Sequence, residues 1–253
     1  MSELPVYLWV LILAGVIAVA AETCFVLYGG AVRAGLGKRT AVLLTTSAAV
    51  LIGGWYIASA LIGAAGDYRT VLGRQIPWLP IVVVAWAGLL LALSRIPVVR
   101  RAVSAPGMRS RLVLPHAARP IEGAAFLIAM FIGFLPPVFS IPAGLGDIAV
   151  GIAAPFVARK LAQGTRRRTA PWFHGLGIAD LVTALTLGGL TGFGLIPGIT
   201  SGTTISELPL VLVPTAAVPI LFVLHIVSLT TRKRPQNTTA PSNETAGSLT
   251  SAR

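Results

Sequence analysis

The chain has 253 residues, of which 55% are hydrophobic and only 11% are charged, and its mean hydropathy is +0.83. Soluble domains carry about 25% charged residues, so this composition excludes an ordinary water-soluble fold. The formal net charge is nevertheless +12, from 20 Lys and Arg against 8 Asp and Glu. An apolar chain whose polar parts are basic is typical of a protein that crosses a membrane several times.

Seven apolar segments are each long enough, at roughly 20 residues, to cross the hydrocarbon core of a bilayer. They cover residues 5–28, 41–63, 78–98, 120–139, 141–159, 171–193 and 208–230. The sequence therefore predicts an all-α bundle of seven transmembrane helices that forms one domain, residues 1–230. The remaining residues, 231–253, are rich in Thr, Ser, Pro and Asn, which predicts a disordered cytoplasmic tail.

Two of these segments leave an alternative open. The first contains Ala18-Val19-Ala20, which imitates a signal-peptide cleavage site, but no Lys or Arg precedes it, so we expect a retained helix. The fourth and fifth segments are separated only by the Pro-rich stretch 135–142. For these two, a re-entrant hairpin is the alternative to two full spans.

The basic residues predict the orientation of the bundle. With the N-terminus outside and seven crossings, every Lys and Arg except Arg69 and Arg74 lies on the cytoplasmic side, as the positive-inside rule requires. We therefore expect a multi-pass protein of the bacterial inner (cell) membrane, with the lipid bilayer as its partner. The longest cytoplasmic loop, residues 95–119, carries six Arg and is explained most simply as an orientation signal.

Contact of that loop with anionic lipids of the inner leaflet is the alternative. Nucleic-acid binding is not expected, because the loop has no interleaved aromatic residues and matches no recognised module.

Charged side chains at membrane depth are costly and are therefore candidates for function. Six acids and histidines fall within the predicted spans: Glu22, Glu122, Asp147, Asp180, His174 and His225. Glu122 follows Pro120 at the start of the fourth span, where a carboxylate stabilises a helix N-terminus, so a structural role is the simpler one. Glu22 lies on a stripe of small residues and should face another helix, either paired with a cytoplasmic-loop Arg or as a functional group.

Asp147 and Asp180 form the most suggestive pair. Asp147 ends the sequence GLGD in the fifth span, and Asp180 ends GLGIAD in the sixth. Each lies on a line of small residues, so each helix offers a narrow groove that holds one carboxylate suited to binding a cation or a proton. Because the two helices run in opposite directions, we expect Asp147 in the outer half and Asp180 near the middle or inner half, as successive stations. The alternative is a pair of packing faces.

His174 and His225 lie toward the cytoplasmic ends of the sixth and seventh spans. Imidazole can relay protons, although a hydrogen-bonded histidine at the membrane interface is the more frequent case. No two histidines have helical i, i+3 or i, i+4 spacing, and the last span has no lysine for a retinal Schiff base, since Lys233 lies beyond it. GxSxG, HExxH and Walker motifs are absent as well, so neither a metal nor a cofactor is predicted.

Pro214 and Pro219 should bend the seventh span and expose backbone carbonyls there.

Three segments carry a resemblance: GLGDIAVGIAAP, WFHGLGIADLVTA and ELPLVLVPTAAVPILFVLHIVSL. Together they resemble a group of uncharacterised bacterial multi-pass membrane proteins, over the region from the fourth to the seventh span. In that group the second segment usually reads WNxLGxxDL, whereas here Phe173-His174 follow Trp172. The resemblance implies the architecture and no activity.

The first hypothesis is a small-solute or ion-coupled transporter that uses Asp147 and Asp180, with Glu22 as a third station. The alternatives are a membrane-embedded enzyme acting on a lipid or isoprenoid through Glu22, His174 and His225, and a non-catalytic sensor or assembly subunit. A shared polar cavity at the two aspartates favours transport. Convergence of Glu22 with the histidines favours catalysis, and isolated pairs favour a structural role.

Overall fold

The chain is helical throughout the part that the computed structural model describes, which is residues 4–69, 77–164, 169–196 and 203–230, and no strand occurs there. Six helices are long and apolar enough to cross a membrane, or seven if two helices bent by 86° are counted as one span. The all-α class is therefore confirmed. The predicted tail and the arginines at 166–168 lie outside the described residues.

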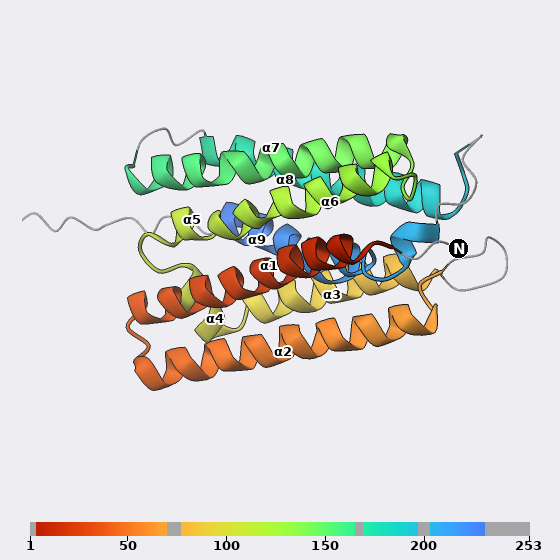
Figure 1. Ribbon diagram of the computed structural model, residues 1–253. Helices are drawn as coiled ribbons and strands as arrows, with labels where there is room; N and C mark the ends of the chain where they lie inside the picture. Colours follow the sequence, from red (N-terminus) through yellow and green to blue (C-terminus); the bar gives the residue numbers. More distant parts are fainter. Residues whose placement is uncertain (1–3, 70–76, 165–168, 197–202, 231–253) are drawn as a thin grey trace, which may run out of the picture.

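The elements follow one another along the chain in this order: α1 Val6–Arg33, α2 Lys38–Ala65, α3 Trp78–Ser94, α4 Pro97–Val103, α5 Met108–Arg111, η1 Leu114–Ala118, α6 Arg119–Phe131, α7 Pro137–Ala162, α8 Thr169–Gly192, η2 Thr203–Ser206, η3 Val213–Ala217 and α9 Val218–Thr230. The long helices lie roughly parallel or antiparallel in one bundle (Figure 1). Helix α2 lies on one side, α7 and α8 on the opposite side, and α1, α6 and α9 between them.

Large apolar side chains cover the outside of this bundle. Phe25 of α1, Leu61 of α2 and Phe156 of α7 are each more than 60% exposed. Such a surface would be unfavourable in water over so large an area, whereas helices with satisfied backbone groups and apolar exteriors are suited to hydrocarbon. The last span, η3 and α9, lies in the interior, since most of its residues are buried.

The fourth span differs from the prediction. We expected it at residues 120–139, but the structure places it at Met108–Phe131, where α5, η1 and α6 follow one another. The helix stops early at Gly133, which has a φ of 80° and lets the N–H of Phe134 bond back to the carbonyl of Ala129. Pro137 then occupies the first position of α7. The expected cytoplasmic loop 95–119 is therefore partly inside the bundle.

Both segments of the suspected hairpin are of membrane-spanning length, since Met108–Phe131 has 24 residues and α7 has 26. The sharp bend occurs elsewhere, between α3 and α4.

The charged residues separate along the bundle axis. Helices α1, α3, α7 and α9 end, and α2 and α8 begin, at the same end of the bundle (Figure 1). We call it the basic end, because it carries Arg33, Lys38, Arg95 and Arg159 with most of the other described Lys and Arg. At the opposite end Arg69 forms an ion pair with Glu207 at 3.1 Å. Arg119 belongs to neither end.

Prolines in the last span free a backbone carbonyl, which was one of the two effects expected of them. The π-helical turn η3 contains Pro214, and Pro219 follows in α9. Pro219 has no N–H for the carbonyl of Thr215 four residues earlier. The indole Nε1 of Trp55 in α2 donates a hydrogen bond to that carbonyl instead, at 2.9 Å. The freed carbonyl thus links η3 to α2.

Candidate functional site

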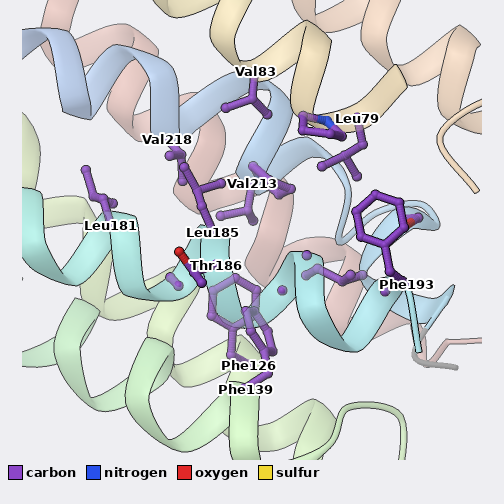
Figure 2. Close-up of a pocket in the computed structure, with 18 of the residues that line it drawn as sticks. Leu79, Val83, Phe126, Phe139, Leu181, Leu185, Thr186, Phe193, Val213 and Val218 are labelled. Atoms are coloured by element: carbon purple, nitrogen blue, oxygen red, sulfur yellow. The ribbon is translucent and has the colours of Figure 1, made fainter. Parts of the chain in front are cut away.

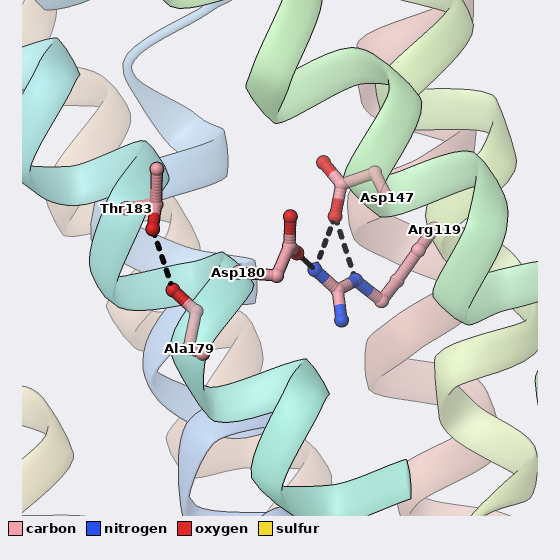
Figure 3. A network of polar contacts seen from close by, with 5 residues as sticks. All are labelled: Arg119, Asp147, Ala179, Asp180 and Thr183. Carbon is pink, nitrogen blue, oxygen red and sulfur yellow. Dashed lines mark hydrogen bonds and ion pairs between the residues drawn. The ribbon is translucent and has the colours of Figure 1, made fainter.

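Arg119, Asp147 and Asp180 form a buried ion-pair cluster, which we call the Arg119 cluster (Figure 3). Nε and Nη2 of Arg119 each lie 2.6 Å from Oδ1 of Asp147, and Nη2 also donates to Oδ2 of Asp180. The Arg119 side chain is fully buried. Its remaining nitrogen, Nη1, is buried without a hydrogen-bond partner among the described residues. Three helices, α6, α7 and α8, thus meet at one guanidinium.

Each member lies near the middle of its membrane-length segment: Arg119 in Met108–Phe131, Asp147 in α7 and Asp180 in α8. We expected the two aspartates at staggered depths. That expectation is wrong, because both carboxylates bind the same nitrogen of Arg119 and so lie at one depth.

Close backbone approach between α6 and α7 brings the cluster together. A Cβ added to Gly123 would lie 2.5 Å from the carbonyl oxygen of Gly144, so the two helices touch through glycine. Small residues permit this distance between membrane helices. On the next face of α7, Gly146 leaves room for the Asp180 carboxylate, whose Cγ would lie 2.7 Å from an added Cβ. The sequence GLGD therefore supplies two contact glycines and one ligand of Arg119.

Glu122 adds a third carboxyl group one turn after Arg119. It is 1% exposed, and its side chain lies against α1, where a Cβ on Gly15 would be 2.7 Å from Glu122 Cγ. As predicted, Glu122 lies in the first turn of α6, just after Pro120, although no side-chain hydrogen bond caps the start of this helix. Glu122 Oε1 is buried without a hydrogen-bond partner among the described residues.

Three histidines pack together between the Arg119 cluster and the basic end. Nδ1 of His174 in α8 lies 2.9 Å from Nδ1 of His225 in α9, and the ring of His116 in η1 stacks on His225 at a centroid distance of 3.9 Å. Phe173 packs edge-on against His116 and His174. All three imidazoles are at most 1% exposed, so they lie inside the bundle and not on its outer surface. No group of His, Cys, Asp and Glu within the described ranges has a metal-binding arrangement.

The histidine group and the Arg119 cluster lie one helical turn apart, both along η1–α6 and along α8, where Gly177 contacts His225. His116 precedes Arg119 by three residues, and Gly177 precedes Asp180 by three. Gly177 packs directly under the ring of His225, where an added Cβ would overlap Cε1 and Nε2. Nε2 of His225 therefore faces α8 one turn before Asp180, and it has no hydrogen-bond partner in the described part of the chain.

A cavity of about 280 Å³ opens on the other side of the Arg119 cluster (Figure 2). We call it the main cavity. It runs from Asp147 and Leu181 at mid-bundle to Leu79 and Phe193 toward the opposite end, between α3, α6, α7, α8 and α9. Its walls are apolar and aromatic, and Asp147 is the charged residue among the described lining residues. The small residues predicted to share a face with Asp180 line it: Ala184, Gly188 and Gly192.

The family model described as Domain of unknown function (DUF8737) matches residues 76–231. The chain belongs to this family. No curated protein and no solved structure matches it. The DUF8737 region begins just before α3 and ends just after α9, so it contains the Arg119 cluster, the three histidines and most of the main cavity wall. The match to a family of unknown function agrees with the resemblance to uncharacterised proteins that the sequence carries.

Glu22 stands apart from this site. It is half-buried in α1, outside the DUF8737 region, and forms neither a hydrogen bond nor an ion pair with any described residue. The expected pair with a cytoplasmic-loop Arg is therefore not formed within the described ranges, and Glu22 does not join the histidines.

Arg119 and His116 are functional candidates that we did not predict, because both were assigned to a cytoplasmic loop. A signal for them exists in the sequence. Buried residues recur from Met108 through Leu112, His116, Arg119 and Gly123 at intervals of four or three. This is the period of a helix with one buried face, and it continues into the apolar part of the fourth span without a break.

Proposed function

We propose that the protein is a multi-pass transporter of a bacterial inner membrane, in which the Arg119 cluster exchanges a proton with a small solute. One observation carries the proposal: Asp147 accepts hydrogen bonds from Arg119 and at the same time lines the main cavity. A solute that reaches the end of the cavity therefore meets a carboxylate that is already part of a buried charge network.

The charge of the cluster supports proton or cation exchange. One guanidinium and two ionised carboxylates carry a net charge of −1 at the middle of the bundle, and Glu122 adds a further acid. Uncompensated charge is expensive at membrane depth. Uptake of one proton or one monovalent cation neutralises the three-residue cluster, so each can replace the other.

The orientation follows from the positive-inside rule. We place the basic end in the cytoplasm, which puts the N-terminus outside and directs the main cavity toward the outside. The histidines then lie between the Arg119 cluster and the cytoplasm. His174 and His225 share a hydrogen bond, and imidazole both accepts and donates a proton. They supply a route by which the cluster exchanges protons with the cytoplasmic side.

The membrane-enzyme alternative receives less support. It requires acid–base groups that converge at a site open to lipid, and the histidines converge only with one another in the closed interior. Glu22 is not among them. A purely structural role predicts isolated pairs, whereas here three helices share one guanidinium beside a cavity.

Reconstituted protein tests the proposal. Proteoliposomes loaded with a pH-sensitive dye are exposed to gradients of alkali cations, organic cations, amino acids and sugars. We expect at least one gradient to move protons through the wild type, and Asp147→Asn and Asp180→Asn to abolish this movement. The control is Asp67→Asn, since Asp67 is an exposed acid at the opposite end. Proton movement that is absent for every solute, or undiminished in both cluster variants, would refute transport of this kind.

A further inference from the structure

We infer that the solute of the main cavity is an apolar organic cation, an alkylated ammonium attached to an aromatic or aliphatic body. The inference rests on the proposed function and specifies its substrate class. It follows from three properties of the main cavity: the negative sign of the one charged residue among its described lining residues, the small number of hydrogen-bonding side chains there, and its size.

The charge that faces the cavity is negative. Asp147 lines the cavity and its side chain keeps 8% exposure, whereas Arg119 is fully buried and does not line it. Both contacts from Arg119 fall on Oδ1 of Asp147. Among the described interactions, the second carboxylate oxygen thus receives no bond from this guanidinium. An anion entering the cavity would meet this carboxylate first and be repelled, and a cation would be attracted.

The walls disfavour a strongly hydrated solute. Two hydroxyl groups, those of Thr186 and Ser206, are the polar uncharged side chains among the described lining residues, and the hydroxyl of Thr186 already donates to the carbonyl of Val182 at 2.7 Å. A sugar or amino acid would lose its hydrogen bonds with water without replacement, and a small metal cation would lack the several oxygen ligands that it needs. A quaternary ammonium ion has no hydrogen-bond donors, so it loses the least.

Aromatic rings line the same cavity as the Asp147 carboxylate. Phe126 and Phe139 meet edge to face at a centroid distance of 5.3 Å, and both line the cavity with Asp147 (Figure 2). Aromatic faces attract quaternary ammonium groups, and they also bury the apolar body of the ligand. A cavity with one carboxylate and two phenyl rings among its described lining residues is therefore matched to a lipophilic cation.

The volume sets the scale of the ligand. At about 280 Å³ the main cavity is roughly twice the ~150 Å³ cavity that accepts one benzene ring. One ring and one trimethylammonium group fit this space. A second cavity of about 290 Å³, between α1, α2, α3, α4 and α9, has no charged residue among its described lining residues. It offers no partner for a cation, so volume alone does not make a site for this ligand.

Binding of such a cation would release a proton. The cation supplies the positive charge that the proton supplied before, so one proton leaves the Arg119 cluster for each cation that enters, and the total charge is unchanged. No covalent bond forms or breaks apart from the O–H bond of the departing proton.

Calorimetry on the purified full-length protein tests the inference with benzyltrimethylammonium as probe. We expect saturable binding that is at least roughly tenfold tighter than that of tetramethylammonium, which lacks the apolar body. Asp147→Asn should abolish it. Gly189→Leu should weaken it by a similar factor, because Gly189 lines the cavity with nothing within 4 Å of an added Cβ.

The matched control is Gly88→Leu, on α3, where an added Cβ also meets nothing within 4 Å and which does not line the main cavity. It should bind as the wild type does. Equal affinity for both ammonium ions, or unchanged binding in Gly189→Leu, would overturn the inference. Proton-coupled flux of another solute without benzyltrimethylammonium binding would overturn it as well, while leaving transport intact. Binding without any flux would instead remove the transport proposal.

Discussion

At the scale of single residues, Arg119 is the centre of the buried charge cluster. A guanidinium remains charged in any protein environment, and at mid-membrane it needs anionic partners at close range. Asp147 and Asp180 provide them from two other helices. The interaction is mutual, because without Arg119 the two carboxylates would be buried side by side with no positive partner.

Arg119→Leu should therefore destabilise the protein strongly, by about 3 kcal/mol, the usual cost of breaking a buried pair from one side. Thermal unfolding in detergent measures the effect. The triple variant Arg119→Leu with Asp147→Asn and Asp180→Asn should recover much of the loss, since no charge is then left unpaired. Arg95→Leu, at an exposed arginine of the basic end, serves as the control. If Arg119→Leu unfolds at the temperature of the wild type, the ion pairs do not stabilise the bundle.

At the scale of helices, glycines set the distances that the site needs. Gly123 and Gly144 bring α6 against α7, Gly146 admits the Asp180 carboxylate, and Gly177 admits the His225 ring. Each glycine lacks the β-carbon that would otherwise hold two elements, or an element and a side chain, apart. The contact positions of α7 and α8 are therefore specified by the same short GLG segments that precede the aspartates.

Gly177→Ala and its neighbour Gly175→Ala make a matched test on one helix. The methyl group of Gly177→Ala would overlap the His225 ring, whereas the Gly175→Ala methyl group meets nothing within 4 Å. Replacing a helical glycine by alanine ordinarily stabilises by roughly 0.5–1 kcal/mol. We expect Gly175→Ala to raise the unfolding temperature slightly, and Gly177→Ala to lower it and to slow proton movement in proteoliposomes. Equal effects of the two changes would show that His225 does not pack as described.

Predictability from the sequence varies between helices. The predicted spans 41–63 and 171–193 lie within a few residues of α2 and α8, because both are long apolar runs. The fourth span was misplaced because Arg109, Arg111 and Arg119 lower the apolar content of a segment that is nevertheless helical and partly buried. Only tertiary contacts distinguish an arginine in a loop from an arginine paired inside a bundle. Counting basic residues along the sequence gives no information on those contacts.

The candidate site was predicted in part for the same reason. Asp147 and Asp180 are visible as acids in apolar spans, and the structure brings them together. Their common partner and the third histidine lie in the misplaced segment. The distance between His174 and His225 depends on how α8 and α9 pack, which neither helix encodes alone.

At the scale of the whole molecule, charge is divided into three zones. The basic end holds most of the cations, the middle holds the Arg119 cluster, and the opposite end holds few charges among the described residues. The main cavity joins the middle to the opposite end, and the histidines occupy the path from the middle to the basic end. A cavity on one side and a packed barrier on the other is the arrangement that alternating access requires in one of its states.

The orientation can be measured with single cysteines in a Cys24→Ser background. Asp67 and Gln163 are exposed at the two ends of the bundle. We expect a membrane-impermeant maleimide to label Asp67→Cys in intact cells, and Gln163→Cys only after the membrane is opened, because the positive-inside rule predicts that the basic end faces the cytoplasm. Labelling of Gln163→Cys in intact cells, with protection of Asp67→Cys, would invert the topology.

The exchange of a proton for a cation at the Arg119 cluster is tested most directly by counting protons. Calorimetric titration of the wild type with benzyltrimethylammonium, repeated in buffers of different ionisation enthalpy, gives the number of protons released for each cation bound. Charge balance at the buried cluster predicts about one proton per cation. Binding that releases no proton would contradict the account, because the cation would then occupy the cavity without replacing a charge at Asp147.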